Sequence, residues 1–367
     1  MSTIGKEVAF IKTSETNARN GEGAFIRLKD GRIMYAYTEY VGNDWSDHAV
    51  AKISAIFSSD EGESWSEKVV LFEPREGEQN VMSVSLINMA NGDVGIFYLT
   101  KSTNKDEIYC TPTFRRSCDG LNWGEPIKCA EEDKYYVVNN DRVIRLKSGR
   151  LAAPVALHGV CKHGEKDHIF TIEPGKIQFV ISDDDGYSWK MLPVSLKSPF
   201  NDERQLQEPG VYQHEDGTIW LYIRTNYGFQ MEAFSHDNCE SWSSLEPNMF
   251  FSSPPSPMHI KKVKDYTIAI FNPIPRYNTR DDDSYNWGRS PYLCAVSKTD
   301  GKGKSAEAFE KIFYFEDDRK SGYCYPAVFE GEDYFLAAYY HSEGTDVCLK
   351  STRIKKVMYS ELENTNL

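Results

Sequence analysis

Ionisable and amide side chains recur at one place in the repeating pattern of this chain. They lie nine residues before a series of tight turns, where strands of mostly apolar residues are expected to begin. These residues are Glu22, Ser83, Asn140, Glu208 and Ser256, and the sixth turn brings Cys324 and Tyr325 to the same place. Amide groups donate hydrogen bonds to sugar hydroxyls, and amide and carboxylate oxygens accept hydrogen bonds from them, as recognition of a sugar requires. The pattern predicts that these side chains meet in one polar pocket.

The residues beside these positions have the same character. Gln207 precedes Glu208, and Asn140 is followed by Asp141 and Arg142. Strand ends are often exposed and polar in any protein, which accounts for part of the pattern. Because the set combines carboxylates, amides, an arginine and a tyrosine, we interpret it as a site for a carbohydrate.

The tight turns indicate β-hairpins. Asp30-Gly31, Asn91-Gly92, Ser148-Gly149 and Asp216-Gly217 each separate two stretches of alternating apolar residues, with weaker copies at Lys264-Asp265 and Glu332-Asp333. Asn-Gly and Asp-Gly between such stretches are strong hairpin signals.

A second repeat, Ser-x-Asp-x-Gly-x-x-Trp, runs out of phase with the hairpins. Copies begin at Ser58, at Ser182 and, with Cys239 in the Gly place, at Ser235. The copy at Ser117 is one residue shorter between Asp and Trp, and a degraded copy without its tryptophan begins at Ser297. The Ser and Asp side chains can bond nearby backbone N–H groups, the Gly supplies a positive φ, and the Trp can pack the turn onto a sheet. We interpret these turns as scaffold.

Six hairpins interleaved with five such turns give a unit of about 60 residues, a period typical of propellers and other repeat arrays. Each unit is consistent with a four-stranded sheet. We therefore expect an all-β fold, a six-bladed β-propeller with four-stranded antiparallel blades, formed by residues 1–367 as a single domain. We also expect the strand at Lys6–Lys12 to close the ring by pairing beside Asp346–Arg353.

Composition limits the classes of partner. The net charge of -13 argues against nucleic acid and against anionic membrane surfaces. The first residues contain no apolar signal segment, and eight scattered cysteines are expected to be reduced. A cytoplasmic location is the resulting expectation.

The turns, hairpins and unit length resemble those of the sialidase (neuraminidase) superfamily, whose Asp-box or BNR repeats build a six-bladed propeller. The resemblance covers nearly the whole chain. It implies a glycoside hydrolase with a Tyr nucleophile, a Glu base, an Asp acid/base and arginines around a substrate carboxylate, and it implies no metal or cofactor.

Particular residues match this pattern. Glu208, in Glu-Pro-Gly-Val before a hairpin, resembles the Glu base, and Arg224 follows where a clamp arginine is expected. Arg289 resembles a second clamp arginine. Tyr325 matches the nucleophile, with Tyr323 as a second choice, and Asp47 (or Asp44) matches the acid/base. Arg142, Asp141, Asn140, Gln207 and Glu22 are expected to bind substrate.

One departure concerns the first blade. Where the family has an arginine that anchors the substrate carboxylate, this chain has Gly21-Glu22-Gly23. Arg19 and Arg27 lie nearby but out of register, and Arg142 could substitute from another direction. The sugar could therefore differ from sialic acid, and Glu22 could itself be catalytic.

We expect an exo-type hydrolase of a terminal acidic sugar, with sialic acid as the leading candidate. Two alternatives stay open. In one, paired carboxylates among Glu22, Asp47, Asp141 and Glu208 hydrolyse another glycoside or act as a lyase on a uronate. In the other, the propeller binds carbohydrate without catalysis.

Overall fold

The structure is a computed structural model that describes residues 3–163, 169–171, 173–200, 206–274, 288–302, 308–318, 320–342 and 349–363. Strands dominate the described part, which contains one short helix, α1 (Tyr359–Glu363). That helix is too short to cross a bilayer, and no other helix occurs among the described residues. Seven cysteines lie in the described ranges, and Cys348 lies outside them.

The first half of the chain forms a sheet of ten strands. It contains two antiparallel runs that meet through a single parallel pair, Ala51 with Asn80. The first run consists of β2 (Asn17–Arg27), β3 (Ile33–Val41), β4 (Ala51–Ser58) and β5 (Val69–Phe72). The second consists of β6 (Glu78–Asn88), β7 (Val94–Asn104), β8 (Glu107–Ser117) and β9 (Ile127–Lys128), and the hairpin β13 (Cys161–His163) and β14 (Ile169–Thr171) extends it.

Three further sheets follow in chain order. The first contains β10 (Tyr136–Val137), β11 (Ile144–Arg145), β12 (Leu151–Leu157), β15 (Lys176–Ser182) and β16 (Lys190–Met191). The second contains β17 (Gln207–Gln213), β18 (Ile219–Arg224), β19 (Phe229–Ser235) and β20 (Glu246–Ser252). The third contains β21 (His259–Val263), β22 (Tyr266–Phe271), β23 (Tyr292–Ser297) and β24 (Lys311–Glu316).

The last sheet joins the two ends of the described chain. It contains β25 (Gly322–Glu330), β26 (Tyr334–Ser342), β27 (Ser351–Met358) and β1 (Lys6–Ile11). In the β1–β27 ladder Lys6 is opposite Lys356, and Ile11 is opposite Thr352. The predicted pairing of the N-terminal strand with the final sheet is confirmed.

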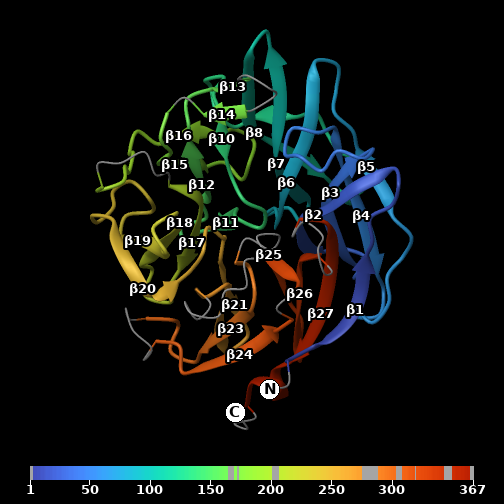
Figure 1. Cartoon of the computed structure of the whole chain (residues 1–367), viewed down its shortest axis with the longest axis vertical. Helices are drawn as coiled ribbons and strands as arrows, with labels where there is room; N and C mark the ends of the chain where they lie inside the picture. The colour runs from blue at the N-terminus through green and yellow to red at the C-terminus, as the bar shows by residue number, and fades with distance from the viewer. Residues whose placement is uncertain are drawn as a thin grey trace.

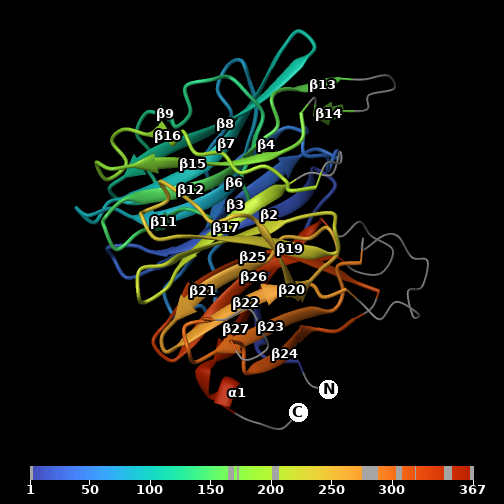
Figure 2. The same ribbon diagram turned by 90° about the vertical axis from the view of Figure 1, so that its left-hand side faces the viewer.

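The sheets are arranged radially around a central axis, as in a β-propeller (Figure 1). β2, β6, β17, β21 and β25 lie nearest the axis in this view, and β2 contacts both β6 and β25. Figure 2 shows the sheets from the side. Apolar residues fill the space between neighbouring sheets: Phe25 and Tyr35 pack with Phe329 and Leu336, for example. The all-β prediction and the four-stranded antiparallel sheets are confirmed.

The Asp turns have the predicted internal bonds. In the first copy the Ser58 hydroxyl donates to Asp60 at 2.8 Å and accepts the Gly62 N–H, and Gly62 has a φ of 83°. The tryptophans reach beyond their own sheet. Trp242, after β19, stacks on Phe179 of β15 with ring centroids 4.6 Å apart. The turns therefore help to hold adjacent sheets together.

Candidate functional site

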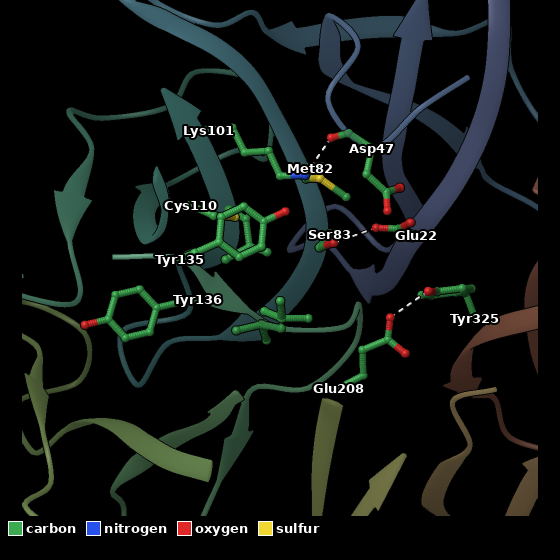
Figure 3. Close-up of a pocket in the computed structure, with 13 residues that line it drawn as sticks. Glu22, Asp47, Met82, Ser83, Lys101, Cys110, Tyr135, Tyr136, Glu208 and Tyr325 are labelled. Atoms are coloured by element: carbon green, nitrogen blue, oxygen red, sulfur yellow. Dashed lines mark hydrogen bonds between the residues drawn. The ribbon is translucent and has the colours of Figure 1, made fainter. Parts of the chain in front are cut away.

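Four inner strands each carry a β-bulge near the central axis. The register shifts lie in the pairings of β2 with β3, β6 with β7, β17 with β18 and β25 with β26. At these bulges Glu22, Ser83, Glu208 and Tyr325 have φ values of 53°, 59°, 45° and 58°. A left-handed conformation is unfavourable for residues other than glycine and occurs often at functional sites. The bulges aim these four side chains into one pocket (Figure 3).

Tyr325 and Glu208 are hydrogen-bonded across the pocket. The Tyr325 hydroxyl donates to Glu208 Oε1 at 2.6 Å, and Arg224 Nη1 donates to Glu208 Oε2 at 2.6 Å. The same Arg224 nitrogen lies 3.3 Å from Tyr325 Oη. Glu208 comes from β17, Arg224 from the end of β18 and Tyr325 from β25. The radial fold thus brings together three residues that the sequence predicted to lie close.

The environment of Tyr325 favours the neutral phenol at rest. Burial raises the pKa of Tyr325 well above its usual value, the negative charge of Glu208 raises it further, and Arg224 and Arg289 offset part of the rise. The phenol therefore cannot ionise by itself at neutral pH and needs an acceptor for its proton. Glu208 lies within hydrogen-bond distance to serve as that acceptor.

Two further carboxylates, Glu22 and Asp47, line the same pocket and share one cation, Arg19. Arg19, which is 1% exposed, bonds the Glu22 carboxylate through Nη2 and Asp47 Oδ1 through Nη1, the latter at 2.5 Å. Its Nε donates to the Tyr340 hydroxyl at 2.7 Å. The Ser83 hydroxyl donates to Glu22 Oε2 at 2.5 Å. One buried guanidinium therefore holds two pocket carboxylates.

The loop that carries Asp47 is fixed by bonds to its backbone. Lys101 Nζ and Asn80 Nδ2 donate to the Asp47 carbonyl at 2.5 and 3.0 Å. Desolvation opposes ionisation of the Asp47 carboxyl, but the charges of Arg19 and Lys101 outweigh it and hold the pKa of Asp47 below its usual value. The Asp47 side chain is 55% exposed, so it can be reached from solvent.

The inner pocket opens beside a larger cavity of about 670 Å³, which lies in the size range of small-molecule sites. Asp47, Glu208 and Tyr325 line both. The larger cavity is also lined by Trp45, His48, His158, Gln207, Arg224 and Arg289. The predicted Gln207, Arg224 and Arg289 therefore lie at the site.

Arg289 contacts the Tyr325 ring and lines the larger cavity. Its guanidinium lies over the Tyr325 ring, 5.6 Å from the centroid, and Nη2 donates to the Pro255 carbonyl at 3.0 Å. Its Nη1 lies 3.2 Å from Cys324 Sγ. With Arg224, it places a second positive charge on the Tyr325 side of the cavity.

Asn140, Asp141 and Arg142, which were predicted to bind substrate, do not line the two cavities described here. Asn140 donates to the Gly23 carbonyl at 2.7 Å, Asp141 pairs with Lys261 at 2.9 Å, and Arg142 donates to the Met258 carbonyl at 2.6 Å. These contacts join the segment before β11 to β2, to β21 and to the residue just before β21.

Tyr323, the second choice for the nucleophile, is buried and stacks on Tyr292 with ring centroids 6.1 Å apart. It does not line the two cavities described here. Asp44 is bonded within its own turn, to Ser46 N at 2.9 Å. Among these alternatives Tyr325 and Asp47 therefore hold the pocket positions.

Sequence reasoning missed Arg19 and Lys101. Arg19 was judged out of register with the position of the family's arginine. Residues three apart in a regular strand, such as Arg19 and Glu22, point to opposite faces. The bulge between Gly21 and Ala24 adds a residue to β2 and lets the two side chains meet. Lys101 lies on an apolar strand, and nothing in the local sequence pattern marks it.

The family model for BNR repeat-like domains matches residues 31–341 of the chain. A search of curated protein sequences found no match.

Among solved structures, a protein of unknown function from Dyadobacter fermentans is similar, with a TM-score of 0.72 and 15% identity over 96% of this chain and 98% of that chain. A leech intramolecular trans-sialidase complexed with 2,7-anhydro-Neu5Ac has a TM-score of 0.69 and 13% identity over 99% of this chain and 71% of that chain. A Trypanosoma rangeli sialidase in complex with 2,3-difluorosialic acid, described as a covalent intermediate, has a TM-score of 0.68 and 12% identity over 98% and 60%. At such identity the likeness shows the propeller fold alone.

Proposed function

We propose that this chain, which belongs to the BNR repeat-like domain family, is an exo-type glycoside hydrolase that removes a terminal sugar. One observation carries the proposal: the Tyr325 hydroxyl donates to Glu208 Oε1 at 2.6 Å inside a pocket that Asp47 also lines. A nucleophile and a base at hydrogen-bond distance are the basic parts of covalent catalysis.

In the first half of the reaction Tyr325 attacks the anomeric carbon while Glu208 accepts the phenolic proton. The glycosidic bond breaks, and the leaving oxygen takes a proton from an acid in the pocket. In the second half water displaces the Tyr325 oxygen, which recovers its proton from Glu208. Asp47 is the acid/base candidate carried over from the sequence. A tyrosine nucleophile of this kind is a recognised exception to the two-carboxylate pattern of glycosidases.

We infer an acidic terminal sugar, with sialic acid as the leading candidate. Support comes from Arg224 and Arg289, whose guanidinium groups lie on the Tyr325 side of the cavity beside Gln207. Guanidinium groups bind carboxylates with matched geometry. Because the chain has a net charge of -13, an anionic substrate needs such a local positive wall.

For the architecture we propose six blades in a single domain spanning residues 1–367. The count follows from dividing the ten-stranded sheet at the single Ala51–Asn80 pair, which gives blades β2–β5 and β6–β9. The other four sheets each supply one blade.

A panel of aryl glycosides tests the function: a sialoside, a uronide and neutral sugars. The wild-type protein should release the aryl alcohol from an acidic member, and Glu208→Gln should lower kcat by about 10²-fold or more because the base is lost. Glu39→Gln is the matched control, since Glu39 is a buried carboxylate on β3 that lines neither cavity. Release from neutral sugars alone would make the arginine assignment wrong, and no release at all would reject the hydrolase.

Three carboxylates in one pocket favour a second candidate, a hydrolase or uronate lyase that works through Glu22, Asp47 or Glu208 without Tyr325. Tyr325→Phe distinguishes the two, because a carboxylate mechanism keeps activity in this variant. A carbohydrate-binding protein without catalysis would instead bind sugar equally well after Glu208→Gln and show no turnover in either form.

A further inference from the structure

Glu22 places a further carboxyl group in the pocket that contains Tyr325 and Glu208, and the function proposed above does not use it. The residue is 3% exposed and lines the inner pocket. Its bulge conformation, with φ of 53°, turns the carboxyl group toward the cavity (Figure 3). Oε2 accepts the Ser83 hydroxyl and Oε1 pairs with Arg19, so both oxygens are held in place.

Charged groups reach Glu22 from several elements: Arg19 on its own strand, Asp47 on the loop before β4, Lys101 on β7 and Glu208 on β17. Burial raises the pKa of Glu22, Arg19 offsets part of that rise, and the negative charge of Asp47 adds to it. The pKa of Asp47 moves the other way, because Arg19 and Lys101 outweigh its desolvation. Of these two carboxyl groups, Glu22 is the one whose surroundings favour the protonated form.

We propose that Glu22, rather than Asp47, is the general acid/base of the reaction; this inference rests on the glycosidase function proposed above. In the first half Glu22 gives its proton to the oxygen of the breaking glycosidic bond and becomes a carboxylate. In the second half this carboxylate takes a proton from the attacking water, which restores the protonated Glu22. One carboxyl group thus serves first as acid and then as base.

The dependence of rate on the leaving group tests this role. Two substrates with the same sugar are compared, a 4-nitrophenyl glycoside and an alkyl glycoside. A nitrophenolate can leave without taking up a proton, whereas an alkyl leaving group needs a proton on its oxygen. Glu22→Gln should therefore lower kcat/KM for the alkyl glycoside by about 10²- to 10⁴-fold and for the nitrophenyl glycoside by less than about tenfold.

Glu39→Gln is the matched control for this change. Glu39 is also buried, accepts a serine hydroxyl (Ser54 Oγ, 2.6 Å) and pairs with a cation, Lys68. Because Glu39 lies outside the cavity lining, its variant should leave the ratio of the two rates unchanged. If Glu22 had only a structural role, Glu22→Gln would lower the rates on both substrates by the same factor, and their ratio would stay unchanged.

A second variant keeps the carboxyl group in place. The Ser83 hydroxyl stabilises the carboxylate form of Glu22, which burial otherwise disfavours, so Ser83→Ala should raise the pKa of Glu22 further. Since the reaction needs protonated Glu22, activity on the alkyl glycoside falls as pH rises through that pKa, and Ser83→Ala should move this fall to higher pH.

The outcomes separate the two proposals. If the wild-type protein hydrolyses the nitrophenyl glycoside and Glu22→Gln slows both substrates equally, the acid role is rejected and the hydrolase remains. If Glu22→Gln does not fold, an unchanged pH profile in Ser83→Ala rejects the role and a shifted profile supports it. If the wild-type protein hydrolyses neither substrate, the function and this role are rejected together.

Discussion

Tyr325 and Glu208 lie 117 positions apart in the chain, yet their side-chain oxygens are 2.6 Å apart. Each adopts a left-handed backbone conformation that costs about 1–3 kcal/mol for a residue other than glycine. Ladder hydrogen bonds on both sides of each bulge hold the strained residue in place. The strained backbone at each bulge therefore points the Tyr325 phenol and the Glu208 carboxylate toward each other.

Arg19 is the residue whose loss should destabilise the protein most at this site. Arg19→Met removes the guanidinium that bonds Glu22, Asp47 and the Tyr340 hydroxyl, and leaves these polar groups without that partner. We expect a loss of about 3–5 kcal/mol in the free energy of unfolding at pH 7. The loss should be smaller at pH 4, because the raised pKa of Glu22 lets that carboxyl group take up a proton.

Urea denaturation measures this change. Arg27→Met is the control, since Arg27 pairs with Glu61 on the surface, with side chains 38% and 53% exposed. That pair should contribute less than about 1 kcal/mol. Equal losses for the two variants would contradict the importance of the buried Arg19 pair.

Among the strands, the bulge in β17 depends on close packing against β18. A Cβ at Gly210, two residues after Glu208, would overlap the ring of Tyr222 on β18. The Tyr222 hydroxyl is itself held, because it accepts the Ile260 N–H at 3.3 Å. Glycine at this position lets β17 approach β18 and sets the direction of Glu208.

Gly210→Ala should therefore displace the β17 bulge, lowering kcat on the aryl glycoside together with the thermal unfolding temperature. Gly124→Ala is the control, because a Cβ there meets only the Arg116 carbonyl oxygen at 3.4 Å. Steady-state kinetics and thermal denaturation of both variants check this. Full activity in Gly210→Ala would show that the bulge tolerates a different backbone position.

The Asp turns should make stability depend on pH in the acidic range. Hydrogen bonds from the Ser64 side chain and backbone lower the pKa of Asp60 to about 2, from about 3.9 in an unfolded chain. A lowered folded-state pKa gives stability that is present above pH 4 and is lost as pH falls toward 2. Asp60→Asn should flatten this part of the curve.

The urea midpoint, followed from pH 5 to pH 2, measures the effect. Asp106→Asn, in the exposed turn between β7 and β8, is the control and should leave the slope unchanged. Parallel curves for wild type and Asp60→Asn would contradict the role of the turn.

Across the whole chain, the sequence predicted the strands and turns that repeat, and it missed contacts that depend on β-bulges. Hairpin glycines and Asp turns recur with a fixed spacing, so the sheets and the pairing of β1 with β27 could be predicted. Glu208 and Tyr325 stand near the start of equivalent strands in the repeat, whereas Arg224 was predicted from the family resemblance. Arg19 was missed because a bulge reverses the face of its strand, whereas the predicted Arg142 donates to the Met258 carbonyl and does not line the two cavities described here.

The proposed hydrolase depends on Tyr325 as the nucleophile and Glu208 as its base. A fluorinated glycosyl fluoride of the accepted sugar should trap the covalent intermediate, which peptide mass spectrometry can locate. We predict a glycosyl adduct on the peptide that contains Tyr325, fragmenting to that residue, and no adduct in Tyr325→Phe. An adduct on Glu22, Asp47 or Glu208 would instead rule out the tyrosine nucleophile.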